Sequence, residues 1–172
     1  ISITNMMVGA TNVAKMSIDP IGEISPGDEF TLTIKLQDSE DCDALGFKLF
    51  YDNTAFEVKS RKFLTGKYGE DPDSGEQRAT KTSNVAENKI IFAFASLNPG
   101  NYYENINGTL ATVTFKAKDT AVGEYDFRLS MDRVTDNDEY FKTESNNVQR
   151  DLELETSSTK VKVKVDATDI NV

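Results

Sequence analysis

The side chains that most often carry catalysis or bind metals are scarce in this chain. Histidine is absent, and Cys42 is the single cysteine among 172 residues. A hydroxyl or thiol nucleophile therefore has no imidazole base beside it, and no cluster of cysteine and histidine can hold a metal ion. Acidic neighbours disfavour the Cys42 thiolate, so we expect an unreactive thiol. No Gly-rich phosphate loop is present either.

The acidic side chains are the remaining source of chemistry. A pair of carboxylates can hydrolyse glycosides, but one of them needs an apolar setting that raises its pKa. No acidic residue here lies in such a sequence context. Residues 71–76 (DPDSGE) have the spacing of a calcium loop, yet Thr82 stands where that loop needs a glutamate. We interpret 71–76 and the oxygen-rich run 136–139 as solvated loops, and predict no catalytic residue and no metal ligand.

Charge and hydropathy limit the classes of partner. With 19 basic and 29 acidic residues the net charge is −10, which disfavours nucleic acid as a partner. No run approaches the ~18 apolar residues of a transmembrane helix, so we expect no membrane contact by this domain. The chain starts at Ile1 without a signal peptide, and we expect it to be a segment of a longer protein.

The elements that would position any site are β-strands, because apolar residues recur with a period of two. Clear runs lie at 30–36, 45–51, 111–117, 125–131 and 161–165, and weaker runs at 13–18, 56–60, 82–86 and 89–97. Turn signals such as Asn107-Gly108 separate them. About nine short strands without an amphipathic helix predict an all-β sandwich or barrel.

The length of the chain suits one domain, spanning 1–172, with a core over about 12–166. Two segments, 65–80 and 135–151, are too polar to be core. We expect both to be long surface loops between strands.

Four segments resemble, in their order, the cohesin family, whose members are the dockerin-capturing modules of bacterial cellulosome scaffoldins. The segments are 25–34 (SPGDEFTLTI), 45–58 (LGFKLFYDNTAFEV), 89–95 (KIIFAFA) and 108–118 (GTLATVTFKAK). The resemblance extends over roughly 12–166. It implies a nine-stranded jelly-roll β-sandwich, in agreement with the number of apolar runs.

The resemblance also implies a function. A cohesin is a non-catalytic module that binds the dockerin of an enzyme or of another scaffoldin, for cellulosome assembly and polysaccharide degradation or for cell-surface anchoring. It implies an extracellular location, secreted or attached to the cell surface. The dockerin carries the calcium, so we expect no cofactor on this chain, and we expect a monomer when the module is alone.

The contact surface of the family is the outer face of the sheet built from the third, fifth, sixth and eighth strands. Alternation places Leu45, Phe47, Leu49 and Tyr51 inward on the third strand, and Phe92 and Phe94 inward on the sixth. The predicted partner-binding residues are Ala44, Gly46, Lys48, Phe50, Val85, Ile91, Ala93, Ala95, Leu97, Asp126, Arg128 and Ser130. In this set, small side chains form a plane for a helix, apolar ones supply buried contacts, and charged ones set the register.

Two residues depart from the familiar family pattern. Many cohesins carry Asn and Asp where this chain has Ala44 and Gly46. This difference indicates a divergent member of the family, of a ruminal or gut type.

Two other functions stay open at this stage. One is a carbohydrate-binding jelly roll, which the absence of Trp disfavours although tyrosines stand at 68, 102, 103 and 140. The other is a structural spacer or adhesin domain of a surface protein.

Overall fold

The computed structural model describes residues 13–39, 44–97, 106–131, 141–145, 148–151 and 154–165, with the backbone alone for 141–145 and 148–151. The strands are β1 (Ala14–Ile18), β2 (Glu29–Gln37), β3 (Ala44–Phe50), β4 (Phe56–Phe63), β5 (Ala79–Ala86), β6 (Lys89–Ser96), β7 (Gly108–Ala117), β8 (Gly123–Ser130), β9 (Phe141–Ser145), β10 (Val148–Asp151), β11 (Leu154–Thr156) and β12 (Thr159–Val163). A short 3-10 helix, η1 (Gly66–Tyr68), follows β4. Among the described residues, no helix is long and apolar enough to cross a membrane.

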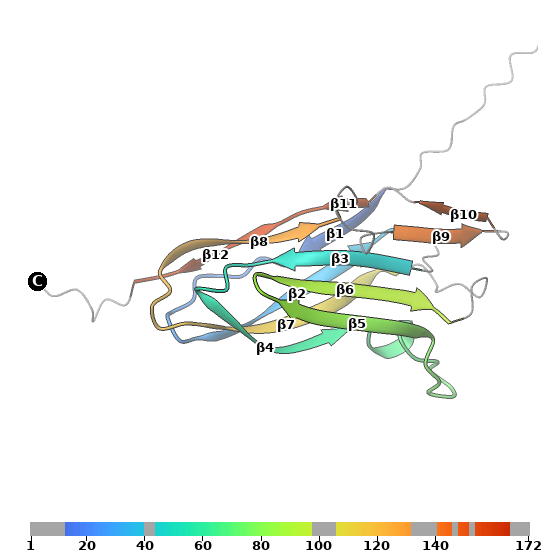
Figure 1. The fold of residues 1–172 in the computed structure, drawn as a ribbon, viewed down its shortest axis with the longest axis horizontal. Helices are drawn as coiled ribbons and strands as arrows, with labels where there is room; N and C mark the ends of the chain where they lie inside the picture. Colours follow the sequence, from blue (N-terminus) through green and yellow to red (C-terminus); the bar gives the residue numbers. More distant parts are fainter. Residues whose placement is uncertain are drawn as a thin grey trace, which may run out of the picture.

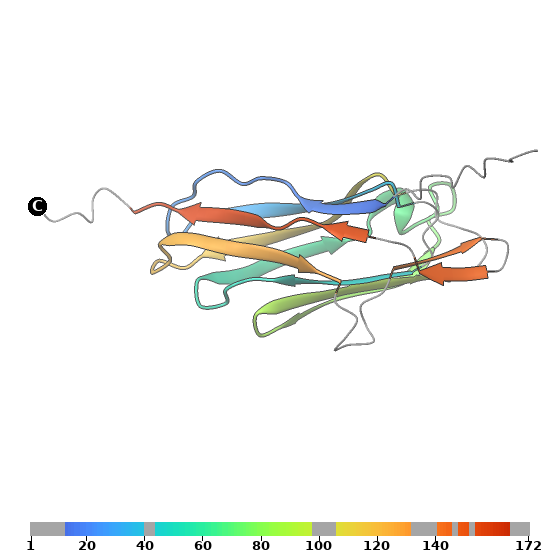
Figure 2. The same ribbon diagram turned by 90° about the horizontal axis from the view of Figure 1, so that it is seen from above.

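The strands form two sheets that stack face to face and run along the long axis of the molecule (Figures 1 and 2). The first sheet has the order β11-β1-β2-β7-β4. The second has the order β10-β9-β3-β6-β5, with β8 also paired to β3 and β12 paired to β8. The prediction of an all-β jelly-roll sandwich is confirmed, and each of the nine predicted runs corresponds to one of β1–β8 or to β12.

The last part of the chain changes from one sheet to the other. β11 pairs in parallel with β1 of the first sheet, whereas β12 pairs antiparallel with β8 of the second. Between them, the Ser157 N–H donates to the Met16 carbonyl oxygen at 2.9 Å. This crossing ties the two sheets together at the end of the chain; β12 corresponds to the expected last strand, and β11 is an additional short strand before it.

The core lies between the sheets and is rich in phenylalanine. Phe47 of β3 stacks on Phe92 of β6 with ring centroids 4.8 Å apart, and Phe63 of β4 meets Phe92 edge-on at 5.2 Å. Phe115 and Phe127 meet at 5.1 Å farther along the sandwich. Burial of each such ring contributes roughly 1.5–3 kcal/mol, so the inward positions of the strands hold the fold together.

The two predicted loops turn out differently. Residues 141–151, expected to be part of a surface loop, contain the hairpin β9–β10, in which Val148 pairs with Ser145. The sequence there (FKTESNNVQRD) lacks apolar alternation, and β9 is recognisable only from its main-chain pairing with Leu45 and Ala44 of β3. The run 136–139 lies outside the described residues.

The other expected loop, 65–80, is a true excursion, although β5 already begins at Ala79 rather than at Thr82. Its turn is closed by hydrogen bonds to the Asp71 carboxylate, whose Oδ1 accepts from the N–H groups of Asp73 at 2.8 Å and Ser74 at 3.0 Å. The Arg78 guanidinium donates to Oδ2 at 3.3 Å. These bonds, the Ser74 N–H first, lower the pKa of Asp71 to about 2. The carboxylate that begins the calcium-like spacing therefore serves to close a turn.

Candidate functional site

The outer face of the sheet β5-β6-β3-β8 is the surface predicted to bind a partner, and it faces the viewer in Figure 1. The predicted alternation is confirmed, because Leu45, Phe47 and Leu49 of β3 and Phe92 of β6 are all 0% exposed. The side chains between them point away from the core. The register of β3 with β6 pairs Ala44 with Ala95, Gly46 with Ala93, Lys48 with Ile91 and Phe50 with Lys89.

The middle of this outer face is a plane of very small side chains. Gly46 lies directly opposite Ala93, and Ala44 lies opposite Ala95, so no atom beyond Cβ rises from these two rows. Two apolar residues border this plane. Ile91 lies on β6 itself, and Leu97, which is 49% exposed, follows the end of β6. A flat strip with apolar margins matches the side of a helix, which can approach the backbone closely there.

The end of the outer face at β8 carries a fixed cation. Arg128 pairs with Phe50 across β8 and β3, and its guanidinium carbon lies 4.3 Å from the centroid of the Phe50 ring. This cation–π contact restrains the guanidinium over the ring, and Arg128 remains exposed to a partner. Asp126, farther along β8, is exposed and lies 3.9 Å from the Lys160 ammonium. A cation–aromatic pair thus forms one margin of the plane.

Lys48 differs from its predicted role. It points to the outer face, but it lies on the central strand between Ile91 of β6 and Ser130 of β8. Only 4% of the residue is exposed, and it is not without an interaction partner in the molecule. Lys48 therefore points outward as predicted, but it offers little exposed surface for the polar contact expected of it.

Val85 is on the wrong side of the sheet for the predicted contact. It pairs with Ile90, which is fully buried, so both side chains belong to the inner side of the sheet. Val85 is nevertheless 42% exposed, because β5 is the last described strand of this sheet. The outward residues of β5 include Thr80, Thr82 and Asn84, opposite Ala95, Ala93 and Ile91.

The sequence did not lead us to predict Thr80, Thr82, Asn84 or Lys89 as residues of the outer face. The run ATKTSNVA has no apolar alternation, so its inward side is not evident from sequence. Lys89, by contrast, is two residues from Ile91 on the same strand, so the alternation of the sequence could have placed it on the outer face. It lies beside Phe50, close to Arg128 in register, and extends the polar margin of the outer face.

Features of other functional classes are not evident in the described part of the chain. No group of three or more His, Cys, Asp or Glu side chains there could hold a metal ion. Among the aromatic residues whose side chains the structure describes, every one is buried or only partly exposed, which disfavours a flat platform for a sugar. Tyr68 is half-buried, and its hydroxyl accepts from the Asn107 N–H at 3.3 Å. Tyrosines 102, 103 and 140 lie outside the described residues.

Two kinds of comparison with known proteins found similarities, one to a family profile and one to solved structures. The family profile described as "Cohesin domain" matches residues 14–163. No curated protein matches the chain by sequence.

Several solved structures share the fold. The seventh ScaB type I cohesin of Pseudobacteroides cellulosolvens has 24% identity and a TM-score of 0.72, over 93% of this chain and 97% of that one. A cohesin solved as the Coh-OlpA-Doc918 complex of Clostridium thermocellum has 19% identity and a TM-score of 0.62, over 88% and 99%. A non-cellulosomal cohesin of the archaeon Archaeoglobus fulgidus has 14% identity and a TM-score of 0.62, over 90% and 93%.

Proposed function

The chain belongs to the cohesin family, and from this premise we propose that it is a non-catalytic binding module that captures a dockerin domain. The dockerin belongs to an enzyme or to another scaffoldin. The module acts outside the cell, in a secreted or surface-attached protein. It needs no cofactor of its own, and the calcium of the complex resides on the dockerin.

The observation that carries this proposal is the plane of small residues on the outer face of the second sheet. The Gly46–Ala93 row and the Ala44–Ala95 row carry no side-chain atom beyond Cβ, which supports close approach of a partner's main chain at the partly buried Ala44, Ala93 and Ala95, whereas Gly46 itself is buried. Leu97 supplies exposed apolar area at one margin, and such area is stabilised when a partner covers it. The structure of the Clostridium thermocellum relative was solved as a cohesin–dockerin complex, which supports the same class of partner.

The composition of the face supports a divergent mode of docking. The outward positions at the start of β3 are Ala44 and Gly46, which cannot donate or accept side-chain hydrogen bonds. Polar recognition therefore falls to the margins, at Arg128 with Phe50 and at Thr80, Thr82 and Asn84. We infer a largely apolar centre with a polar rim, which is the usual anatomy of a specific interface.

The experiment that tests this proposal is calorimetric titration with a panel of dockerins from the same genome. Each dockerin is measured with calcium and again with a chelator. Tight binding of some members, lost with chelator, is the expected result, because the calcium-loaded dockerin is the folded one. If no member of the panel binds, the proposal is wrong and the spacer or sugar-binding function returns.

A further inference from the structure

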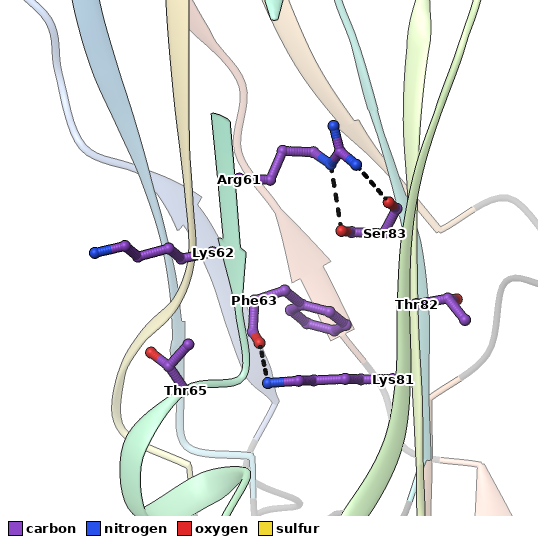
Figure 3. Close-up of a pocket in the computed structure, with 7 residues that line it drawn as sticks. All are labelled: Arg61, Lys62, Phe63, Thr65, Lys81, Thr82 and Ser83. Atoms are coloured by element: carbon purple, nitrogen blue, oxygen red, sulfur yellow. Dashed lines mark hydrogen bonds between the residues drawn. The ribbon is translucent and has the colours of Figure 1, made fainter. Parts of the chain in front are cut away.

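The free edges of the two sheets meet along one side of the sandwich, away from the outer face. Among the described strands, β4 is the last strand of the first sheet and β5 the last of the second. Two long cationic side chains bridge them (Figure 3). Arg61 of β4 donates from Nε to the Ser83 hydroxyl at 3.3 Å and from Nη2 to the Ser83 carbonyl oxygen at 3.0 Å. Lys81 of β5 donates to the carbonyl oxygens of Phe63 and Leu64, each at 3.0 Å.

A pocket of about 300 Å³ opens between these bridges. Its lining comes from Arg61, Lys62, Phe63, Thr65, Lys81, Thr82 and Ser83. In Figure 3 the Phe63 ring lies between the Arg61 and Lys81 side chains, whereas the side chains of Lys62 and Thr82 point away. The register agrees, because Lys62 pairs with Thr112 and Thr82 with Ala93 on the outer surfaces of their sheets. The pocket is therefore a two-cation site with hydroxyl groups from Thr65 and Ser83 at its rim.

The two cations lack an acidic counterpart in the part of the chain that the structure describes. None of the ion pairs there includes Arg61 or Lys81, although the chain as a whole carries a net charge of −10. Each cation also keeps N–H groups beyond those bonded to the facing strand, since a guanidinium has five and an ammonium three. Positive charge with spare donors is the ordinary requirement for binding a carboxylate.

The same contacts prepare the cations for a ligand. Arg61 and Lys81 are exposed, yet each is held by two hydrogen bonds to the opposite strand. Their side-chain entropy is already largely lost on folding, so binding an anion costs less than it would for free surface side chains.

A simpler role for the two cations is the protection of open strand edges, where inward-pointing charges prevent pairing with another chain. That role explains the bonds to the carbonyl oxygens, but it does not require a pocket between two cations that have no acidic partner among the described residues.

We propose that the pocket between β4 and β5 binds a small hydroxylated carboxylate, with its anionic group at Arg61 and Lys81 and its hydroxyl groups toward Thr65 and Ser83. The site lies at the β4–β5 edge and shares only Thr82 with the outer face, and the proposal does not depend on dockerin binding.

The test is an amide NMR titration of the whole chain with D-glucuronate, with D-glucose and acetate as matched probes. Glucuronate is expected to cause saturable shifts at residues 61–65 and 81–83, while glucose causes none there and acetate binds at least ~5-fold more weakly. Absence of saturable shifts with glucuronate overturns the proposal. Equal binding of glucose, or equal binding of acetate, also overturns it, because the pocket would then not select a hydroxylated anion.

Two variants complete the test. Arg61→Gln removes the charge and is expected to weaken glucuronate binding by about 10-fold or more, the scale of one charge-assisted hydrogen bond. Lys116→Gln makes the same charge change on the outer surface of the first sheet and should leave the affinity within about 2-fold. Equal affinities of the two variants would overturn the assignment of the site. If Arg61→Gln does not fold, the titration of the native chain decides alone.

Discussion

The outer surfaces of the two sheets have the same architecture but carry different side chains. The first sheet exposes hydroxyl and charged residues, with Thr31 opposite Thr114 and Thr33 opposite Thr112. The Thr31 and Thr114 hydroxyl oxygens are 2.9 Å apart and form a hydrogen bond with each other. The second sheet has the Gly46–Ala93 plane at the corresponding place, with Leu97 at its margin. Both sheets turn large apolar residues inward, such as Phe115 in the first and Phe47 in the second, so the contrast lies in the outward positions.

This comparison indicates how a binding face arises on a sandwich. Threonine favours strands and is well solvated, which suits a surface that stays in water. Glycine and alanine add little strand propensity and shield little of the backbone. Their presence at the centre of a sheet is therefore better explained by a partner than by stability.

The largest effect concerns the inner layer that both surfaces share. Replacing Phe47 with Ala removes a fully buried ring that stacks on Phe92, and should lower the free energy of unfolding by about 3–5 kcal/mol. Urea unfolding followed by fluorescence measures this loss. Dockerin affinity of the fraction that remains folded should change little, because Phe47 does not reach the outer face. A loss below about 1 kcal/mol would mean that the core is packed differently.

The next effect separates the two outer surfaces. Replacing Ala93 with Arg puts a long charged side chain into the centre of the small-residue plane and should weaken dockerin binding by at least ~100-fold. The unfolding midpoint should stay almost unchanged, because Ala93 is only partly buried.

The matched control is Thr112→Arg, which makes a similar change on the first sheet and should leave binding intact. Calorimetry with a dockerin that binds the native chain compares the two variants. Equal losses, or none in Ala93→Arg, would show that the partner binds elsewhere.

A smaller effect is expected at the polar margin. Arg128→Gln removes the cation that stacks on Phe50 and should reduce dockerin affinity by about 3- to 30-fold, with a weaker dependence on salt. The control Lys35→Gln removes a cation from the first sheet, where Lys35 pairs with Asp19 at 2.9 Å. Affinity measured at two salt concentrations distinguishes a contact at Arg128 from a change in net charge.

The smallest effect concerns the excursion beside Leu97, whose N–H donates to the Arg78 carbonyl oxygen at 2.9 Å. The pKa of Asp71 is lowered to about 2 by the Ser74 and Asp73 N–H groups and by Arg78. A lowered pKa means that the contribution of Asp71 to the turn is present above its ordinary pKa of 3.8 and is lost as pH falls through about 2.

Carboxyl NMR titration should therefore find Asp71 still ionised at pH 3, and Arg78→Gln should move its pKa upward. An Asp71 that titrates near 3.8 in the native chain would show that the turn is open in solution. The outer face itself should remain intact in either case, because its small-residue plane contains no titratable group.

Much of the fold and of the candidate face was predictable from the sequence. Where one side of a strand is buried, the period of two reports it, and Phe47, Leu49 and Phe92 made the parity of β3 and β6 readable. From that parity Ala44, Gly46, Ala93 and Ala95 could be placed outward correctly. The same reasoning worked for Arg128, because Phe127 and Leu129 beside it are buried.

In β5 and in the hairpin β9–β10, the alternation of apolar residues did not predict the structure. Ala79 is the one buried residue of β5. Without a repeat of buried apolar residues, the sequence did not show that Val85 points inward and Asn84 outward. The hairpin β9–β10 has no apolar alternation at all, and was predicted to be a loop.

The sequence by itself determined the strand runs, the inward side of the strong strands and the small-residue character of the outer face, because burial of alternate apolar residues imposes its period on the chain. Only the tertiary structure decided which strands are neighbours. That neighbourhood set Lys48 on a central strand between Ile91 and Ser130, set Arg128 on Phe50, and brought Arg61 and Lys81 across two sheet edges. These contacts join residues far apart in the chain, so no local pattern records them.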